Sequence, residues 1–289
     1  MNGDIHAPWV RLDLTSRPEA ARLVRSMSSA AGEALDFDPE LLADVNTAVS
    51  EACNNVILHA YGDEPGRVGG RVGPFSVELR AGADAIEVRV CDQGSGIRRT
   101  VPDRDGLKVG LALMSAVADR AEFINIPDGG TEVRLSFRAP NRRRGIPWTP
   151  ARGTENGSSA WQAELHSGLT GDVVLTVSPV SLLAPVLGRI GRSLAPSAGF
   201  SLQRCADVYA LSDVLAAHAE RDAESTSISV ALGAHERRLE FVLAPLRVGA
   251  GARRDQPRST LASLTEDFSF VTREGHETLR VSMRDHLRT

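Results

Sequence analysis

Cysteine is scarce in this sequence, since its 289 residues include only three, Cys53, Cys91 and Cys205. These three are scattered, with no CxxC pair and no cysteine–histidine spacing of the kind that binds zinc. The pattern excludes a disulfide framework and a zinc-finger type of site. It predicts free or buried thiols in a reducing compartment.

Long apolar runs and a strong excess of one charge are also absent. No stretch is apolar enough to span a bilayer, and charged residues stand near the N-terminus where a signal peptide needs an apolar run. The formal net charge is −4, which disfavours nucleic-acid binding driven by overall charge. We therefore expect a soluble, cytoplasmic protein without direct nucleic-acid or membrane partners.

What is present suits a globular protein of two domains. Hydrophobic residues make up 42% and charged residues 24% of the chain, and its length allows one large or two ordinary domains. A stretch rich in proline, glycine and serine, with the basic run Arg142–Arg144, predicts a linker. The run is either a solvated cluster or a contact for a partner or a phosphate. The predicted division is a domain at 1–140, a linker at 141–170 and a domain at 171–289.

The first half alternates between strand and helix patterns. Period-two and helical periodicities, with turn residues between them, set the boundaries. Thr15 or Ser16 is the expected cap of the first helix, and Asp38 the expected cap of the second. The expected elements are a strand at 9–14, helices at 19–34 and 40–60, a hairpin of strands at 75–80 and 85–90, a helix at 110–123 opened by Gly110, and a strand at 132–137.

One polar ridge on the second helix draws attention. Glu51, Asn55 and His59 follow one another at i, i+4 spacing, beside an apolar stripe. A carboxylate one turn before a carboxamide suits a water and a metal ion, although a solvated helix edge has the same pattern. The stripe that should pack on the core consists of Val45, Val49, Ala52 and Val56.

A second feature is the turn that follows the hairpin. Asp92 ends the strand, and Gly94 and Gly96 follow at i+2 and i+4. Glycine permits positive φ and a close approach of the backbone to a ligand. A carboxylate at a strand end can accept a hydrogen bond from an exocyclic amine such as that of adenine. An ordinary turn or a fragment of a calcium loop looks alike, but the further acidic ligands of a calcium loop are missing.

Two glycine positions complete the pattern. Residues 98–108 are polar and predict a mobile loop, after which Gly110 and Leu111 open a helix. Backbone N–H groups at a helix start can hold phosphate, although Gly110 could also be an ordinary glycine there. Gly130 and Thr131 precede the last strand of the half.

These features, in this order, resemble the N, G1, G2 and GT boxes of the Bergerat-fold (GHKL) ATPases. The stretch SEACNNVILHAY is similar to the form found in anti-sigma-factor serine kinases. The resemblance covers about residues 9–138. It implies an α+β fold, a two-layer α/β sandwich with a mixed, mostly antiparallel sheet and helices on one face.

The resemblance also implies roles for these residues. Asn55 would coordinate Mg²⁺ on the phosphates of ATP, and Glu51 would act as the general base for a protein serine or threonine. Asp92 would bind the adenine amine, with Thr131 in support through water, and His59 would pack or hydrogen-bond within the helix end. Contacts to the nucleotide are implied for Gly94, Gly96, Lys108, Gly110 and Leu111.

Lys108 is a departure from the family pattern. The G2 box is usually Gly-x-Gly-Leu, whereas this chain has Lys108-Val-Gly-Leu. The lysine could pair with a phosphate, or it could stiffen the loop at 98–108 that the resemblance makes a lid. Both outcomes stay open.

The second half repeats the pattern of the first in weaker form. Residues 200–219 align with residues 41–60 without a gap, and the later hairpin and last strand also match. This predicts an intramolecular duplication. The chemistry is not retained, because Ala210 and Val214 stand at the places of Glu51 and Asn55. Pro245 stands at the place of Asp92, and Arg247 at that of Gly94. We interpret this half as a degenerate pseudo-ATPase domain that could replace a partner subunit, giving a monomeric pseudo-dimer.

The function that the resemblance implies is that of an anti-sigma regulatory factor with kinase activity. Its partners would be a sigma factor and an anti-anti-sigma factor of the STAS type, and its cofactors ATP and Mg²⁺. One alternative is a non-catalytic, nucleotide-sensing docking module, which Lys108 and the decayed second half favour. Another is an ATPase without a protein substrate.

Overall fold

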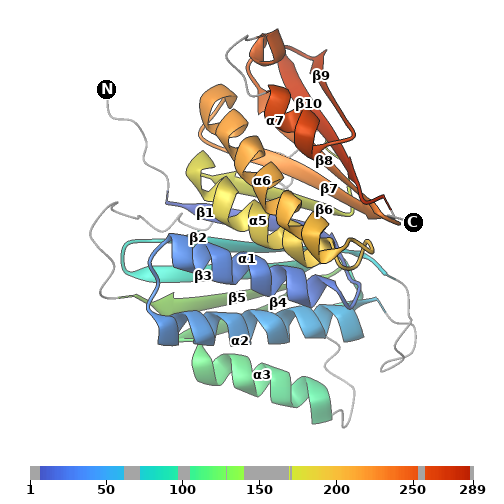
Figure 1. The fold of residues 1–289 in the computed structure, drawn as a ribbon. Coiled ribbons are helices and arrows are strands. Elements are labelled where there is room, and N and C mark those ends of the chain that lie inside the picture. The colour runs from blue at the N-terminus through green and yellow to red at the C-terminus, as the bar shows by residue number, and fades with distance from the viewer. Residues whose placement is uncertain are drawn as a thin grey trace. The chain divides into compact units, whose positions relative to one another are not determined.

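The computed structural model describes residues 7–61, 72–96, 105–127, 129–139, 169, 171–252 and 258–286, with the side chains of 105–108 and 258–259 excepted. Contacts divide the chain into two compact units, Met1–Leu165 and His166–Thr289 (Figure 1). Nearly all of the predicted linker at 141–170 lies outside the described residues. Each unit is described below by itself.

The first unit contains a β-α-α-β-β-α-β-β succession. A short π-helix, η1, directly continues the second helix. The elements are β1 (Trp9–Thr15), α1 (Ala20–Ala34), α2 (Pro39–Asn55), η1 (Val56–Ala60), β2 (Pro74–Ala81), β3 (Ala85–Asp92), α3 (Asp105–Val117), β4 (Arg120–Asn125) and β5 (Thr131–Arg138).

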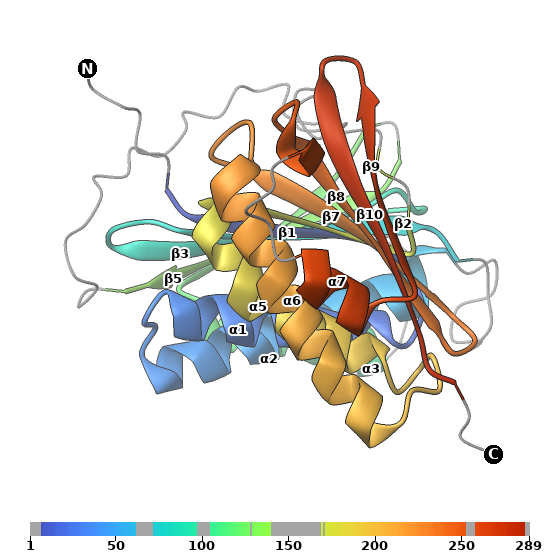
Figure 2. The same ribbon diagram turned by 45° about the horizontal axis from the view of Figure 1, so that its top comes forward.

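These strands form one sheet in the order β4-β5-β3-β2-β1. Every pair within the unit is antiparallel. The helices lie on one face of this sheet, with α1 against β1 and α2 against β3 and β5 (Figure 2). The predicted α+β, two-layer class is therefore confirmed for this unit.

Alternation along the strands explains the two layers. Each strand from β1 to β5 except β4 buries every second residue, as a sheet does when one of its faces meets a core. Strand β2 also buries Glu78 on its other face. The opposite face carries arginine–carboxylate pairs two residues apart on one strand, such as Arg11–Asp13 at 2.6 Å and Arg134–Glu132 at 2.7 Å. The layer of helices is thus fixed to one side by the binary pattern of the strands.

Helix α2 is placed by its cap and its apolar stripe. The Asp38 side chain accepts a hydrogen bond from the Glu40 N–H at 2.9 Å, and Pro39 occupies the first turn. The predicted stripe is buried, with exposed fractions of 4% or less. Its members are Val45, Val49, Ala52 and Val56.

Three local predictions for the first half were wrong. Ser16 does not cap α1: its hydroxyl accepts a hydrogen bond from the Gly73 N–H at 3.0 Å, and Glu19 at the cap makes no side-chain bond. The helix predicted at 110–123 ends at Val117, and Arg120–Asn125 forms strand β4. Helix α3 begins at Asp105, so Gly110 lies inside it and does not open it.

The second unit has the same kind of succession. Its elements are β6 (Val173–Ser178), a 3-10 turn η2 (Val180–Leu182), α5 (Leu183–Leu194), α6 (Leu202–Asp222), β7 (Ile228–His235), β8 (Arg238–Leu246), a 3-10 turn η3 (Ala250–Ala252), α7 (Arg258–Leu264), β9 (Asp267–Arg273) and β10 (His276–Arg284).

Its strands are ordered β6-β7-β8-β10-β9, again with antiparallel pairs throughout. When β6 to β10 are matched in chain order with β1 to β5, this is the strand order of the first unit. The two central helices, α5 and α6, stand where α1 and α2 stand in the chain order. Shared topology agrees with the predicted duplication, which stays an interpretation.

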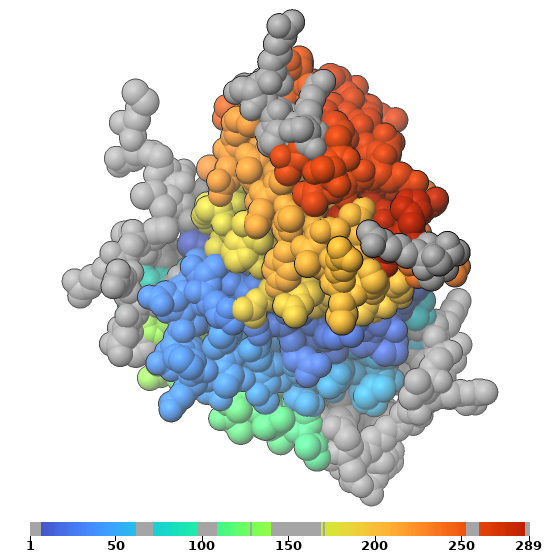
Figure 3. Space-filling view, viewed as in Figure 1, coloured from blue at the N-terminus to red at the C-terminus, as the bar shows by residue number. Residues whose placement is uncertain are grey.

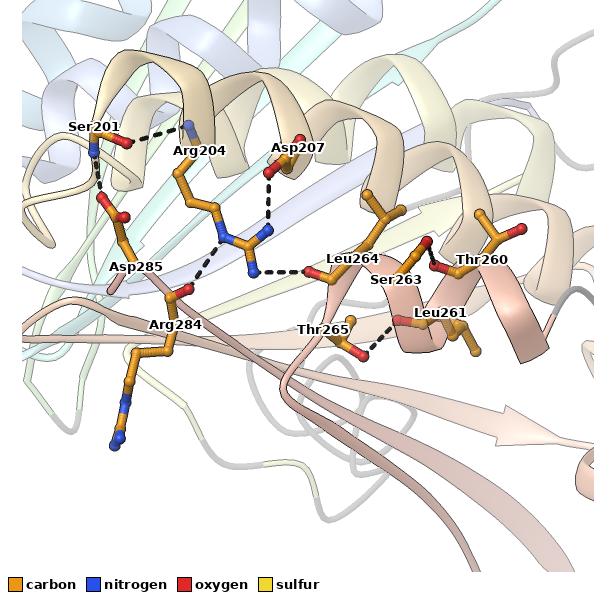
Figure 4. Close-up of polar contacts among 10 residues, drawn as sticks. All are labelled: Ser201, Arg204, Asp207, Thr260, Leu261, Ser263, Leu264, Thr265, Arg284 and Asp285. Atoms are coloured by element: carbon orange, nitrogen blue, oxygen red, sulfur yellow. Dashed lines mark hydrogen bonds and ion pairs between the residues drawn. The ribbon is translucent and has the colours of Figure 1, made fainter. Parts of the chain in front are cut away.

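One arginine joins three elements of the second unit. The Arg204 guanidinium of α6 donates to the carbonyl of Arg284 at 3.1 Å and to that of Leu264 at 3.0 Å, and it pairs with Asp207 at 2.8 Å (Figure 4). The end of α7 and the end of β10 are thereby attached to the first turns of α6. Beside this network, Asp285 accepts a hydrogen bond from the Ser201 N–H at 2.6 Å.

Within the part of the chain that the structure describes, no helix combines the length and the apolar character needed to cross a membrane.

Candidate functional site

The polar ridge of α2 faces the backbone of α3. A Cβ placed on Gly110 would lie 3.1 Å from Glu51 Oε2 and 3.4 Å from Asn55 Oδ1. Both side-chain oxygens therefore lie close to one point on the surface of α3, and only a residue without a side chain leaves them this room. Figure 3 shows α2 and α3 side by side at the surface of the first unit.

A second cluster forms where β3 ends beside the start of β5. The Asp92 carboxylate, only 5% exposed, accepts a hydrogen bond from the Gly94 N–H at 2.8 Å. It also accepts hydrogen bonds from the backbone and from the side chain of Thr131. The structure thus brings Asp92 and Thr131 into direct contact, whereas the GT box alone only suggested support through water.

Burial raises the pKa of Asp92, and the hydrogen bonds from Gly94 and Thr131 oppose that rise. A carboxylate offers about four lone-pair sites, so these three hydrogen bonds leave room for about one more donor. A single exocyclic amine is a donor of that kind. The cluster can therefore read one N–H group of a ligand from a nearly dry position.

The π-helix η1 links the two clusters. Asn55 immediately precedes it, and Ala60 at its end accepts a hydrogen bond from the Ser95 N–H at 2.9 Å. A Cβ on Gly94 would lie 2.2 Å from the Ala60 carbonyl oxygen, so no other residue fits there without movement of the backbone. Gly94 thus lets the turn after β3 approach the helix end. Single π-turns inside α-helices are frequent at functional sites.

Gly96 has a different local role. It adopts φ +75°, a value that favours glycine, and a Cβ there would lie 3.3 Å from Asn125 Oδ1. Gly130, with φ +103°, has no room for a side chain either, because a Cβ would lie 2.1 Å from the Asp92 carbonyl oxygen. Both glycines hold the turn after β3 against the turn before β5.

The predicted lid falls largely outside the described residues. Residues 98–104 are not described, and 105–108 belong to α3. Lys108 therefore lies in a helix and not in a loop, although its side chain is among those not described. Leu111 is half-buried in α3, one residue beyond Gly110.

Tyr61 was not predicted as part of the site. Its hydroxyl accepts a hydrogen bond from the Gln93 N–H at 2.8 Å and donates to the Pro74 carbonyl. The pKa of Tyr61 is raised by burial first and also by the negative charge of Asp92, whereas the Gln93 N–H lowers it. Tyr61 fixes the residue next to Asp92 and belongs to the second cluster. His59, in contrast, is half-buried within η1.

The donor set suits a nucleotide better than a preformed metal site. Among the described residues, no group of three or more histidine, cysteine, aspartate or glutamate side chains converges in a way that could hold a metal ion. Mg²⁺ usually keeps several waters and binds through few protein oxygens together with substrate phosphates. One amide oxygen from Asn55 beside the Glu51 carboxylate fits that kind of binding.

Comparison with known proteins identifies a family and several relatives. The family described as "Histidine kinase-like ATPase domain" matches residues 14–137. Serine-protein kinase RsbW of Bacillus licheniformis is 32% identical over 153 residues, which are 48% of this chain and 89% of that protein. Anti-sigma F factor of Thermoanaerobacter sp. (strain X514) is 27% identical over 139 residues, 44% of this chain and 91% of that protein.

Among solved structures, the RsbU and RsbW domains of Rv1364c from Mycobacterium tuberculosis align with 49% of this chain and 35% of that one. The identity there is 24% and the TM-score is 0.35, which is too low to establish a shared overall fold.

The first unit, two-layered and with a nearly dry carboxylate at a strand end, matches a family of ATPase domains. The chain belongs to the GHKL, or histidine kinase-like, ATPases, and within them to the anti-sigma-factor serine/threonine kinase type. Membership implies that the first unit binds ATP.

Proposed function

We propose that the first unit is an ATP- and Mg²⁺-dependent kinase that phosphorylates a serine or threonine of an anti-anti-sigma protein of the STAS type, and that the chain acts as an anti-sigma factor. The observation that carries the proposal is the approach of Glu51 and Asn55 to one point beside Gly110. The names of the relatives support the protein substrate and the sigma factor as partners.

Each residue has a role in this proposal. The Asp92 carboxylate accepts the adenine amine, and Thr131 holds that carboxylate in place. The Asn55 amide oxygen would hold the cation. Glu51 takes the proton of the attacking serine or threonine hydroxyl, the hydroxyl oxygen bonds to the γ-phosphorus, and the bond between that phosphorus and ADP breaks. When bound, Mg²⁺·ATP supplies the phosphoryl group, and its cation supplies positive charge that offsets the negative charge of the phosphates.

The test is phosphate transfer from γ-labelled ATP to a panel of STAS-type proteins. We expect Glu51→Gln to lower the rate by about 10²–10⁴-fold, the usual contribution of a general base, while ATP binding persists. Glu40→Gln is the control, because Glu40 is an exposed carboxylate at the other end of α2.

A second candidate is a nucleotide-sensing docking module without transfer. The observation that favours it is helix α3, which is already wound from Asp105, through the position where Lys108 replaces the usual glycine. A wild-type chain that binds ATP and a STAS partner but transfers no phosphate would establish this candidate and refute the kinase.

A further inference from the structure

A carboxylate of the second unit accepts hydrogen bonds from the backbone of a loop. This loop corresponds to the turn after β3 in the first unit. Glu277, 8% exposed, begins β10 beside the segment that follows β8. Its Oε1 accepts the N–H of Gly249 and its Oε2 the N–H of Gly251, both at 2.8 Å. Each oxygen of this carboxylate thus has a backbone donor.

Strand register identifies the position. In the first unit Val90 of β3 pairs with Val133 of β5, and Asp92 and Thr131 each lie two residues beyond that pair.

In the second unit Leu243 of β8 pairs with Leu279 of β10, and a count of two residues along each strand gives Pro245 and Glu277. The register shifts between Glu277 and Leu279, so Glu277 itself pairs with Leu246, one residue beyond Pro245. Glu277 therefore stands at the place of Thr131, and Pro245 at that of Asp92. The turn agrees as well, because Gly249, four residues after Pro245, has φ +88°, and Gly96, four residues after Asp92, has φ +75°.

The two units therefore place a carboxylate on different strands, and its hydrogen bonds serve different purposes. In the first unit it comes from β3, accepts bonds from Gly94 and Thr131, and keeps capacity for a ligand. In the second unit it comes from β10, and both oxygens bind the loop. Two nearby backbone N–H groups form an anion-binding concavity, and Glu277 is the anion that occupies it.

Packing closes the same region from the other side. A Cβ on Gly251 would lie 2.5 Å from Cγ of Phe270, so the ring of β9 fills the space against this loop. Phe270 in turn meets the ring of His218 on α6 edge-on, with 6.1 Å between the ring centroids. Side chains of β9 and α6 therefore occupy the neighbourhood of the loop.

We infer that Glu277 is an internal ligand that holds the loop Arg247–Ala252 closed, so that the second unit takes no nucleotide and needs none to keep its fold. The inference rests on the strand register and the contacts of Glu277. It does not depend on kinase activity in the first unit.

The first test is chemical rescue in the full chain. We expect Glu277→Ala to lower the thermal midpoint of the second unit by about 4 °C or more, since two buried N–H groups lose their acceptor. Acetate should restore part of that loss, whereas chloride at equal ionic strength should not. The matched control is Glu236→Ala, which removes an exposed carboxylate from the β7–β8 turn. Neither this substitution nor the addition of acetate to this variant should move the thermal midpoint.

An unchanged midpoint in Glu277→Ala would overturn the inference, and so would equal stabilisation of wild type and both variants by acetate. If Glu277→Ala does not fold, Glu277→Gln keeps one acceptor oxygen and should show a smaller fall.

The second test is the stoichiometry of Mg²⁺·ATP binding to the full chain by calorimetry. We expect one site per chain, and none in Asp92→Asn. A site that survives in Asp92→Asn would overturn the inference. Absence of binding in wild type would refute the proposed function and still agree with a closed second unit, so the two failures are distinguishable.

Discussion

Gly110 shows how a single residue can separate stability from activity. It lies in the interior of α3, where alanine is favoured over glycine by about 0.5–1 kcal/mol. A methyl group there would also lie 3.1 Å from the Glu51 carboxylate, the flexible end of a long side chain. The carboxylate can give way, and the fold then keeps its packing while the proposed base leaves its position.

We therefore expect Gly110→Ala to unfold at the same temperature as wild type or higher, and to transfer phosphate about 10²-fold more slowly, as misplaced catalytic groups do. Thermal unfolding and the transfer assay measure the two effects. Ala112→Gly, an exposed change on the same helix, should lower stability slightly and leave transfer intact. Equal transfer by Gly110→Ala and wild type would contradict the position assigned to Glu51.

His218 is the residue whose protonation should set the pH dependence of the second unit. Burial lowers its pKa, the positive charge of Arg221 lowers it further, and Asp222 acts in the opposite direction. The imidazole is 1% exposed, its Nδ1 lies 2.9 Å from the Arg221 guanidinium, and its Nε2 has no hydrogen-bond partner among the described residues. The folded state therefore disfavours the charged ring.

Because the unfolded chain titrates at about 6.5, it binds the proton more readily than the folded chain below that pH. We expect the unfolding midpoint in denaturant to fall as pH is lowered from about 7.5 to about 5.5. His218→Gln should flatten this slope whatever its own stability, whereas His235→Gln, an exposed change, should preserve it. A slope that is unchanged in His218→Gln would refute the assignment.

At the scale of elements, the hairpin and the two long helices of the first unit followed from periodicity, but two elements did not. Strand β4 contains Arg120, Ala121 and Glu122, residues that suit helices, and it is only half-buried at the edge of the sheet. Its pairing with β5 decides its conformation, and such pairing is not a local property. The start of α3 was missed because Gly106 and alternating charges resemble a loop.

The sequence indicated candidate site residues only where the type of side chain itself suggests a chemical role. Glu51, Asn55 and Asp92 were predicted because carboxylates and amides at these spacings suggest ligands, and their roles stay a prediction. Tyr61 gave no such signal, since its hydroxyl bonds to the backbone of Gln93 and Pro74, which any residue carries. Contacts to backbone groups of distant segments leave no trace in residue type.

Arg204 should control how three elements of the second unit hold together. Its guanidinium binds the last carbonyls of α7 and β10. The last carbonyls of a helix have no partner within that helix. We expect Arg204→Ala to cost about 1–3 kcal/mol in the free energy of unfolding. Hydrogen exchange should speed up in residues 260–286 first.

Arg204→Lys should recover only part of this stability, because an ammonium cannot reproduce the planar fork. Arg273→Ala, which removes an exposed arginine from β9, should change neither stability nor exchange. Protection in residues 260–286 that is equal in Arg204→Ala and wild type would show that the network is dispensable.

At the scale of the whole molecule, the interpretation of the second unit as a stand-in for a partner subunit makes a prediction about mass. We expect sedimentation equilibrium to report a monomer of 30.9 kDa over a wide range of concentration. A tight homodimer of the full chain would contradict that interpretation, while the first unit could still bind ATP. The measurement therefore tests the role of the duplication separately from the nucleotide chemistry.

The π-turn of η1 also affects how the two halves compare. The stretches that end in His59-Ala60 and His218-Ala219 align without a gap, yet the first passes through a π-turn and the second stays α-helical to Asp222. Beyond Asn55 and Val214 the two helices no longer keep the same angular phase, so the two histidines correspond in the alignment without being equivalent in space. One is half-buried and the other is 1% exposed. Two stretches of equal length can thus be wound differently, and an alignment without gaps then misplaces the residues that follow the π-turn.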